Sequence, residues 1–301
     1  MVPLIIDTDM GTDCGDAGAL RVAHSLMDQG DCNILATTCP ATYDFSPGCI
    51  DAINKFHGRG YIPVGQNKGA AVAPGPDPTV YNQYVATNFS NRYPTAGTAP
   101  DAVTVLRRAL VGAADNSVIF CALGQLANLQ HLMVSAGDSI STLTGLNLML
   151  KKLKAVYVMA GDFPNGNEYN IYTDWTTAQY FFANFNGPVF VTGFTDGLNI
   201  KTGQAIVTLA PTTDPVYWCY KKFKDAGNAL PRESWDALTL YAAVRNDFPF
   251  YPSTGRRLTV YSDGTNSWQL DATSQQTAIR LAGYYTEMAS VIDYLILKPN
   301  Y

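Results

Sequence analysis

Near its beginning the chain reads Leu4-Ile-Ile-Asp7-Thr-Asp9-Met-Gly11-Thr-Asp13-Cys-Gly15-Asp16-Ala17. The apolar run that opens this acidic segment predicts a short buried strand, and helical character begins at about residue 16. Between the two lie four carboxylates within ten residues: Asp7, Asp9, Asp13 and Asp16.

The acidic segment needs a compensating charge, because four like charges crowded at the end of a buried strand repel one another. A hard cation with oxygen ligands removes that repulsion, and Ca²⁺ accepts more carboxylates and a looser geometry than Mg²⁺. The alternative is that one aspartate caps the helix and the others lie on a solvated turn. Capping accounts for one carboxylate and not for four, so the segment predicts a metal or sugar-binding site.

The composition is that of a protein with a full hydrophobic core. The chain has 301 residues, of which 47% are hydrophobic and 15% charged. One domain over residues 1–301 fits this length at least as well as two. The net charge is −5, and the two lysine clusters at 151–154 and 221–224 are interpreted as solvated helix faces. A nucleic-acid partner is therefore not expected.

The sequence predicts no membrane partner, because no apolar run reaches the roughly 18 residues of a spanning helix. Residues 1–6 are too short for a secretory signal, which indicates the cytoplasm by default. A trimmed leader would leave the same sequence, and the low charge and the 18 tyrosines also fit an exported or assembly-bound form.

The cysteines and histidines form no metal-binding pattern. The six cysteines are scattered without a CxxC pair, so a zinc site is not expected. Free buried thiols are favoured over disulfides. The three histidines share no ligand spacing and are interpreted as packed or surface residues.

Apolar runs and helical segments alternate along the chain. Strands are predicted at 4–6, 32–38, 62–65, 118–123, 155–159 and 188–191. Helices are predicted at about 16–28, 47–57, 101–111, 126–133, 174–185 and 213–225, and from 235 onward. This alternation predicts a doubly wound, mostly parallel central sheet flanked by helices.

Two regions depart from the alternation. Residues 68–99, rich in Gly, Pro, Asn and Tyr, predict a long irregular excursion that forms a rim or lid. Beyond Phe248 the pattern is less regular, and the runs at 257–261 and 267–270 around Asp263-Gly264 predict a β-hairpin.

Polar clusters follow the predicted strands at the edge where ligands bind in sheets of this kind. They are the acidic segment, residues 124–128 and residues 161–170. A further cluster, Glu233-Ser-Trp-Asp236, directly precedes an apolar helix. Taken alone, Ser234 or Asp236 is better interpreted as the cap of that helix. Taken with the other clusters, Asp236 supplies another carboxylate to the same metal.

These motifs resemble those of the calcium-dependent nucleoside hydrolases, the inosine–uridine-preferring type and its relatives, over nearly the whole chain. Asp7-Thr-Asp9-Met-Gly11-Thr-Asp13-Cys-Gly15-Asp16 is similar to the family variant Asp-Thr-Asp-Met-Gly-x-Asp-x-Asp-Asp. Ala122-Leu-Gly-Gln-Leu-Ala-Asn128 stands where the family has Ala-Leu-Gly-Pro-Leu-Thr-Asn, and Glu168-Tyr-Asn170 where it has Glu-Phe-Asn. Ser234-Trp-Asp236 stands where the family has an Asp, often after His.

The resemblance implies calcium-dependent hydrolysis of an N-glycosidic (ribosyl) bond in a small-molecule nucleoside or ribosyl substrate. Asp9 would be the general base that acts on a metal-activated water. The implied metal ligands are Asp9, Asp16, Asp236 and the backbone carbonyl of Ala127. The residues implied to hold the ribose hydroxyls are Asn167, Glu168 and Asn170. Asp7 would not contact the metal; it would lie behind the metal ligands and orient the turn that carries them.

Three departures from the family pattern bear on this assignment. Gly15 stands where the variant motif has an aspartate that contacts ribose, and Asp13 is the candidate to replace it. Trp235 stands where some members have a histidine; an indole does not relay a proton but can stack on a base. Cys39-Pro40 stands where many members place a ribose-binding asparagine.

Because of these departures, the sequence is also compatible with a second function. The protein would then be a catalytically weakened or inactive nucleoside hydrolase-like module that binds a ribosyl or glycan ligand, or that has a structural or recognition role. The retained carboxylates favour catalysis, whereas the low charge and residues 68–99 favour recognition. A phosphatase or sugar kinase is disfavoured because the sequence has no phosphate-binding glycine-rich loop or basic clamp. Members of the family are commonly dimers or tetramers, so a homo-oligomer is expected.

Overall fold

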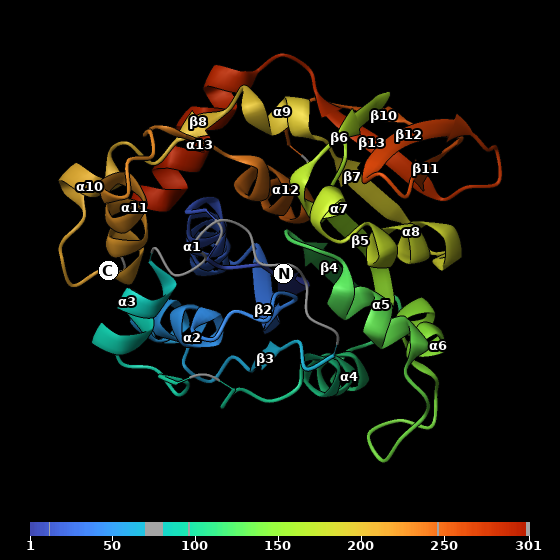
Figure 1. Cartoon of the computed structure of the whole chain (residues 1–301), viewed down its shortest axis with the longest axis horizontal. Coiled ribbons are helices and arrows are strands. Elements are labelled where there is room, and N and C mark those ends of the chain that lie inside the picture. The colour runs from blue at the N-terminus through green and yellow to red at the C-terminus, as the bar shows by residue number, and fades with distance from the viewer. Residues whose placement is uncertain (12, 70–80, 96, 246, 299–301) are drawn as a thin grey trace.

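The computed structural model describes residues 1–11, 13–69, 81–95, 97–245 and 247–298. Its main feature is an eight-stranded sheet in the order β10-β13-β7-β5-β4-β1-β2-β3 (Figure 1). The strands are β1 (Val2–Asp7), β2 (Cys32–Cys39), β3 (Val64–Gln66), β4 (Val118–Ala122), β5 (Leu153–Met159), β7 (Val189–Thr192), β10 (Phe250–Ser253) and β13 (Gln276–Leu281). Neighbouring strands are parallel except for β10 and β13, which are antiparallel.

Helices cover both faces of this sheet. One hydrophobic cluster contains side chains of α1 (Gly15–Asp28), α2 (Ser46–Phe56), α3 (Asn82–Asn88), α11 (Pro215–Asp225), α12 (Trp235–Val244) and α13 (Tyr285–Leu297). The other contains side chains of α4 (Ala102–Gly112), α5 (Ala127–Val134), α6 (Gly145–Lys152) and α8 (Trp175–Asn184). The short helices are α7 (Tyr169–Thr173), α9 (Phe194–Leu198) and α10 (Ile206–Leu209).

Strand β1 shows why both faces are apolar. Leu4 and Ile6 belong to one cluster and Ile5 to the other, and all three are fully buried. Alternate side chains of a strand point to opposite faces, so a strand covered on both sides reads as a continuous apolar run. The prediction of a doubly wound, mostly parallel sheet flanked by helices is confirmed.

The chain order of the strands creates a crevice for a ligand. From β1 the sheet continues to β2 and β3 on one side and to β4, β5 and β7 on the other. The strand order therefore reverses between β1 and β4, and ligands bind beyond the carboxyl ends of strands at such a point. The acidic segment follows β1 at this position.

Two small sheets lie outside the central one. β11 (Arg256–Val260) and β12 (Thr265–Leu270) form the predicted hairpin and continue to β6 (Asn165–Asn167). The second is the two-stranded ribbon of β8 (Lys201–Thr202) and β9 (Arg232–Glu233), which leads directly into α12.

The carboxyl-terminal part is more regular than the sequence pattern indicates. β10 is a partly exposed strand at the end of the sheet and contains Pro252, which weakens its strand signal. β13 carries Gln276, Thr277 and Arg280 among its apolar residues, so it lacks the continuous apolar run of the other parallel strands. Both strands belong to the central sheet.

The prediction for residues 68–99 is only partly testable, because 70–80 and 96 lie outside the described residues. The described part contains α3, so it is not irregular throughout. Tyr81, just before α3, is fully buried, and its hydroxyl donates to the backbone carbonyl of Asp13 at 2.6 Å. The region thus contacts the acidic segment directly.

Two further expectations concern the cysteines and the membrane. All six cysteines are buried and none forms a disulfide, which confirms the prediction of free buried thiols. Across the described ranges, no helix combines the length and the apolar character that crossing a membrane requires.

Candidate active site

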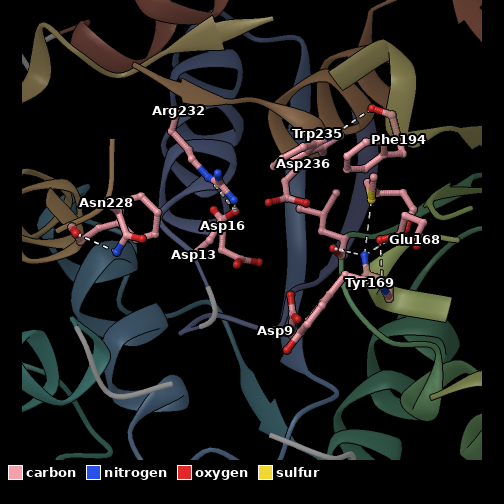
Figure 2. A pocket seen from close by; sticks show the side chains of 14 residues that line it. Asp9, Asp13, Asp16, Glu168, Tyr169, Phe194, Asn228, Arg232, Trp235 and Asp236 are labelled. Atoms are coloured by element: carbon pink, nitrogen blue, oxygen red, sulfur yellow. Dashed lines mark hydrogen bonds and ion pairs between the residues drawn. The ribbon is translucent and has the colours of Figure 1, made fainter. Parts of the chain in front are cut away.

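A pocket of about 340 Å³ lies at the carboxyl edge of the sheet, where Figure 2 shows its side chains converging. Its residues come from the segments that follow β1, β4, β5 and β7 and from the approach to α12. They are Asp9, Asp13, Asp16, Leu123, Met159, Glu168, Tyr169, Asn170, Phe194, Phe223, Asn228, Arg232, Trp235 and Asp236. Three of the four polar clusters predicted from separate parts of the sequence therefore meet in one place, whereas no residue of the cluster at 124–128 lines the pocket.

Asp9 and Asp16 form the acidic floor of this pocket. The Asp9 carboxylate accepts from the Gln125 side chain at 2.9 Å, and Asp16 accepts from the Thr8 hydroxyl. Burial raises the pKa of Asp9 to about 6, and the negative charge of Asp13 adds to this effect. Burial also raises the pKa of Asp16, helped by its acidic neighbours Asp9, Asp236 and Asp13.

Asp7 lies at the end of β1, behind the pocket. It is fully buried, and its Oδ1 accepts from Thr38 at 2.6 Å and from Asn128 at 2.8 Å. Its Oδ2 has no hydrogen-bond partner among the described residues. Burial raises the pKa of Asp7 to about 7.

Asp236 reaches the acidic floor from the first turn of α12. A Cβ added at Gly15 would lie 2.7 Å from Asp236 Oδ2 and 2.7 Å from Asp13 Oδ1, so both carboxylates crowd the space above this glycine. Burial raises the pKa of Asp236, and the charges of Asp13, Asp9 and Glu168 raise it further. Ser234 is the N-cap residue of α12, but its side chain makes no capping hydrogen bond.

Asp13 is held by an arginine that the sequence motifs did not indicate. Arg232 donates to Asp13 Oδ2 from Nε at 3.1 Å and from a terminal nitrogen at 2.8 Å. Arg232 also donates to Glu233 at 2.8 Å. It is the one Lys, Arg or His side chain among the described residues that line the pocket.

Glu168 and Asn170 shape the opposite side. The Glu168 carboxylate caps α7 and accepts from the backbone N–H groups of Asn170, Ile171 and Gly161. Burial raises its pKa to about 7. The Asn170 amide donates to the carbonyls of Leu123 and Met159, each at 3.1 Å, and so joins the ends of β4 and β5.

Aromatic side chains form the upper part of the pocket. Trp235 stacks on Phe194 with ring centroids 5.4 Å apart, and its indole N–H donates to the Phe194 carbonyl at 2.8 Å. The Arg232 guanidinium lies 5.0 Å from the Trp235 ring and 5.4 Å from the Phe223 ring. These flat apolar surfaces suit a planar heterocycle.

The donor set has the chemistry that a hard cation requires. Asp9, Asp16 and Asp236 are buried oxygen donors. The charge of Asp9 raises the pKa of both Asp16 and Asp236, and positive charge between the three would remove this cost. Oδ2 of Asp7 is buried and has no hydrogen-bond partner among the described residues, so a nearby positive charge or a bound proton would stabilise this carboxylate as well. As the side chains lie, however, no group of three or more His, Cys, Asp or Glu in the described ranges is arranged to hold a metal ion.

With this geometry the chain can be compared with known proteins. No protein-family model matches it, and no curated protein matches its sequence. Solved structures do match it. A plant nucleoside hydrolase, the PpNRh1 enzyme, is 19% identical with a TM-score of 0.72 over 99% of both chains. The inosine–uridine-preferring nucleoside hydrolase from Bacillus anthracis is 15% identical with a TM-score of 0.73, covering 99% of this chain and 100% of that one.

The chain has a nucleoside hydrolase-like fold. The type III effector protein XopQ, whose structure is complexed with adenosine diphosphate ribose, shares it at 12% identity and a TM-score of 0.67. That alignment covers 99% of this chain and 94% of the effector chain. The resemblance seen in the sequence motifs is thus confirmed at the level of the fold.

Within this nucleoside hydrolase-like fold, most of the predicted site residues meet in the pocket. Those that line it are Asp9, Asp13, Asp16, Glu168, Asn170, Trp235 and Asp236. Two others do not: Asn167 is exposed on β6, and Ala127 is the buried first residue of α5. Asp7, for which a supporting role was predicted, also lies outside the lining.

Several lining residues were absent from the sequence prediction. They are Leu123, Met159, Tyr169, Phe194, Phe223, Asn228 and Arg232. Leu123 directly follows β4 and Phe194 comes two residues after the end of β7, so the rule that sites lie at strand ends could have indicated them. Phe223 lies on α11, Asn228 in the segment after it and Arg232 on β9, and no local motif marks them.

Proposed function

We propose that this protein hydrolyses the N-glycosidic bond of a ribonucleoside or a related riboside. The observation that carries the proposal is one pocket with two unlike halves. Buried carboxylates line one half, and stacked aromatic rings line the other. A nucleoside has the same division, with a hydroxylated sugar on one side and a planar base on the other.

The acidic half suits a Ca²⁺ ion held by Asp9, Asp16 and Asp236. When bound, such an ion supplies positive charge that lowers the pKa of water and attracts vicinal hydroxyls. The chemistry of the three carboxylates supports this assignment, although their present arrangement is not a closed metal site. The Ala127 carbonyl is not part of the proposed set, because it does not line the pocket.

The sugar is oriented by hydrogen bonds from the chain. Asp13, Glu168 and Asn170 offer acceptors to ribose hydroxyls from different sides of the pocket. Cleavage of a glycosidic bond develops positive charge on the sugar ring. Fixed carboxylates around the ring stabilise that charge without having to reorganise.

Asp9 is the proposed general base. Its pKa of about 6 leaves it mostly ionised at neutral pH, yet basic enough to take a proton from the attacking water. Its hydrogen bond with Gln125 holds the carboxylate in one orientation. A general base in this position typically contributes about 10²- to 10⁴-fold to the rate.

The departing base meets aromatic rings and no histidine, since none lines the pocket among the described residues. Trp235 offers stacking but not its N–H, which already donates to Phe194. This observation favours a second candidate function, a module that binds a riboside without cleaving it rapidly. The similarity to an effector whose structure holds adenosine diphosphate ribose supports the same alternative.

One assay separates the two functions. The protein would be incubated with CaCl₂ and a panel of purine, pyrimidine and nicotinamide ribosides, and released reducing sugar would be measured beside the Asp9→Ala variant. Sugar release that depends on Asp9 supports hydrolysis. Riboside binding in a calorimeter without release above the Asp9→Ala background supports the binding module instead.

A further inference from the structure

The described residues that line the pocket include one guanidinium, that of Arg232. Neither the solubility of the protein nor its fold requires an arginine at this position. Arg232 belongs to β9, whose pairing with β8 anchors it, and Glu233 is itself paired with Lys201 at 3.1 Å. From this ribbon the side chain passes between the rings of Phe223 and Trp235 and reaches the acidic floor. Figure 2 shows its nitrogens directed at Asp13.

The contacts of Asp13 are divided between its two oxygens. Oδ2 accepts both N–H groups from Arg232, at 3.1 and 2.8 Å. Oδ1 accepts from the backbone N–H of Gly15. A carboxylate oxygen has two acceptor positions, so, counting donors from the described residues, Oδ2 is saturated while Oδ1 retains one for another donor. The carboxylate therefore has a fixed orientation and one acceptor position left.

Gly15 supplies the space for this arrangement. A Cβ there would lie 2.7 Å from Asp13 Oδ1, which is closer than unbonded atoms of these types approach. Any other residue at 15 would push the carboxylate away from its present position. Asp13 can face the pocket only because residue 15 has no side chain and because Arg232 fixes the far oxygen.

We propose that Arg232 is a positioning residue, which holds Asp13 Oδ1 as the acceptor for one ribose hydroxyl of the bound riboside. This inference rests on the proposed function and adds a specificity element to it. The pair selects ligands with a free hydroxyl at that ribose carbon. Without Arg232, Asp13 would rotate toward solvent, since its side chain is already 19% exposed.

The test compares Arg232→Met, Arg232→Lys, Asp13→Ala and the double variant Asp13→Ala/Arg232→Met. Inosine and its 2′-deoxy and 3′-deoxy analogues serve as substrates with CaCl₂. Inosine and adenosine diphosphate ribose serve as calorimetric probes. Arg257→Met is the matched control, because Arg257 pairs with Asp271 at 2.8 Å far from the pocket and is 28% exposed, against 29% for Arg232.

We expect Arg232→Met to raise KM or Kd about tenfold, with kcat changed less than threefold, and Arg232→Lys to lie between it and the wild type. Asp13→Ala should raise KM or Kd ten- to a hundredfold, as expected for a lost hydrogen bond to a charged group. In the Asp13→Ala background, Arg232→Met should have no further effect. The Asp13 effect should also disappear on the one deoxy analogue that lacks the recognised hydroxyl.

Other results overturn the proposal. If Arg232→Met leaves KM and Kd unchanged, or if its effect multiplies with that of Asp13→Ala, Arg232 does not act through Asp13. If Arg257→Met raises KM equally, the effect is one of general stability. A wild-type protein that neither cleaves nor binds any of these ribosides, with or without Ca²⁺, overturns the proposed function itself and this inference with it.

Discussion

The indole N–H of Trp235 donates to the backbone carbonyl of Phe194 at 2.8 Å while the two rings stack 5.4 Å apart. One hydrogen bond and one ring contact thus tie the first residue of α12 to the first residue of α9. The indole has no other donor, so its remaining contribution to a ligand in the pocket is its apolar face. The pair forms a rigid wall on which a nucleobase can lie.

Replacing Trp235 should therefore weaken base binding without abolishing chemistry. An aromatic pair contributes about 0.5–1.5 kcal/mol beyond burial, so Trp235→Leu should raise KM three- to tenfold with little change in kcat. Trp235→Phe keeps a ring and should stay within about threefold of the wild type. Steady-state kinetics on inosine and uridine measure both, with Tyr61→Leu as an exposed aromatic control. A kcat loss of a hundredfold in Trp235→Leu would assign the indole a chemical role instead.

Gly124 should be as important for activity as a residue that contacts substrate. A Cβ at this position would lie 2.7 Å from Asp9 Cβ and 2.8 Å from Asp9 Cγ and Oδ1, so Gly124→Ala displaces the proposed base. A displacement of about 1 Å can cost two orders of magnitude in rate. We expect kcat to fall at least tenfold in Gly124→Ala.

Gly112, the last residue of α4, provides the control for that variant. A Cβ there would meet nothing within 4 Å, and Gly112→Ala should keep full activity. Equal kcat values for Gly124→Ala and the wild type would show that Asp9 does not need its present position.

The response to Ca²⁺ should depend on pH in a defined direction. Folding raises the pKa of the proposed ligand Asp9 to about 6 and also raises the pKa of Asp16 and of Asp236, so the folded protein binds these protons more tightly than the unfolded chain. Their contribution to stability is present at low pH and is lost as pH rises above about 4, through the folded pKa of each group. A cation binds the ionised carboxylates, so added CaCl₂ should raise the melting temperature more at pH 7.5 than at pH 5.5.

Variants locate that effect. Asp16→Asn and Asp236→Asn should remove most of the Ca²⁺-induced shift in melting temperature, whereas Asp263→Asn on the exposed hairpin turn should retain it. A shift of equal size at both pH values, or one that survives both pocket substitutions, would place the ion elsewhere.

His24, in another part of the molecule, should make the free energy of unfolding depend on pH in the opposite direction. It is fully buried, stacked on His57 at 4.2 Å, and its Nδ1 accepts from Arg59 at 3.1 Å. Burial and the Arg59 charge lower its pKa to about 3. The folded state keeps His24 neutral while the unfolded chain protonates below about 6.5, so stability is lost as pH falls. At pH 5 this single group costs about 2 kcal/mol of unfolding free energy.

Urea unfolding at pH 7 and pH 5 measures this term. The His24→Gln variant should be less stable than the wild type at pH 7, because it loses the ring stack, but the difference should shrink by about 2 kcal/mol at pH 5. A constant difference between wild type and His24→Gln at both pH values would show that His24 is protonated in the folded protein.

Apolar runs in the sequence were sufficient to predict the central strands of the sheet. β1, β2, β4, β5 and β7 were all predicted within a few residues, because a strand buried on both faces is mostly apolar along its length. β10 and β13 were missed, since an end strand with a proline and a strand with three polar residues carry no such signal. α13 was missed as well, although it buries Met288, Ile292, Leu295 and Ile296 on one face.

The candidate site divides in the same way. Asp9, Asp16, Glu168 and Asn170 lie in the segments that follow predicted strands, and parallel strands bring their carboxyl ends to one edge. Their meeting in one pocket was therefore predictable from order along the chain. Asn167 was placed among them by the resemblance to nucleoside hydrolases, yet the structure leaves it exposed on β6.

The acidic segment separates what the sequence determines from what only the tertiary structure decides. The sequence by itself determined that four carboxylates follow a buried strand and that residue 15 lacks a side chain. The structure alone decided what Asp13 does, because its partner Arg232 lies 219 residues away and reaches it from a separate ribbon. Contacts over such a distance depend on how whole elements pack, and no spacing along the chain encodes them.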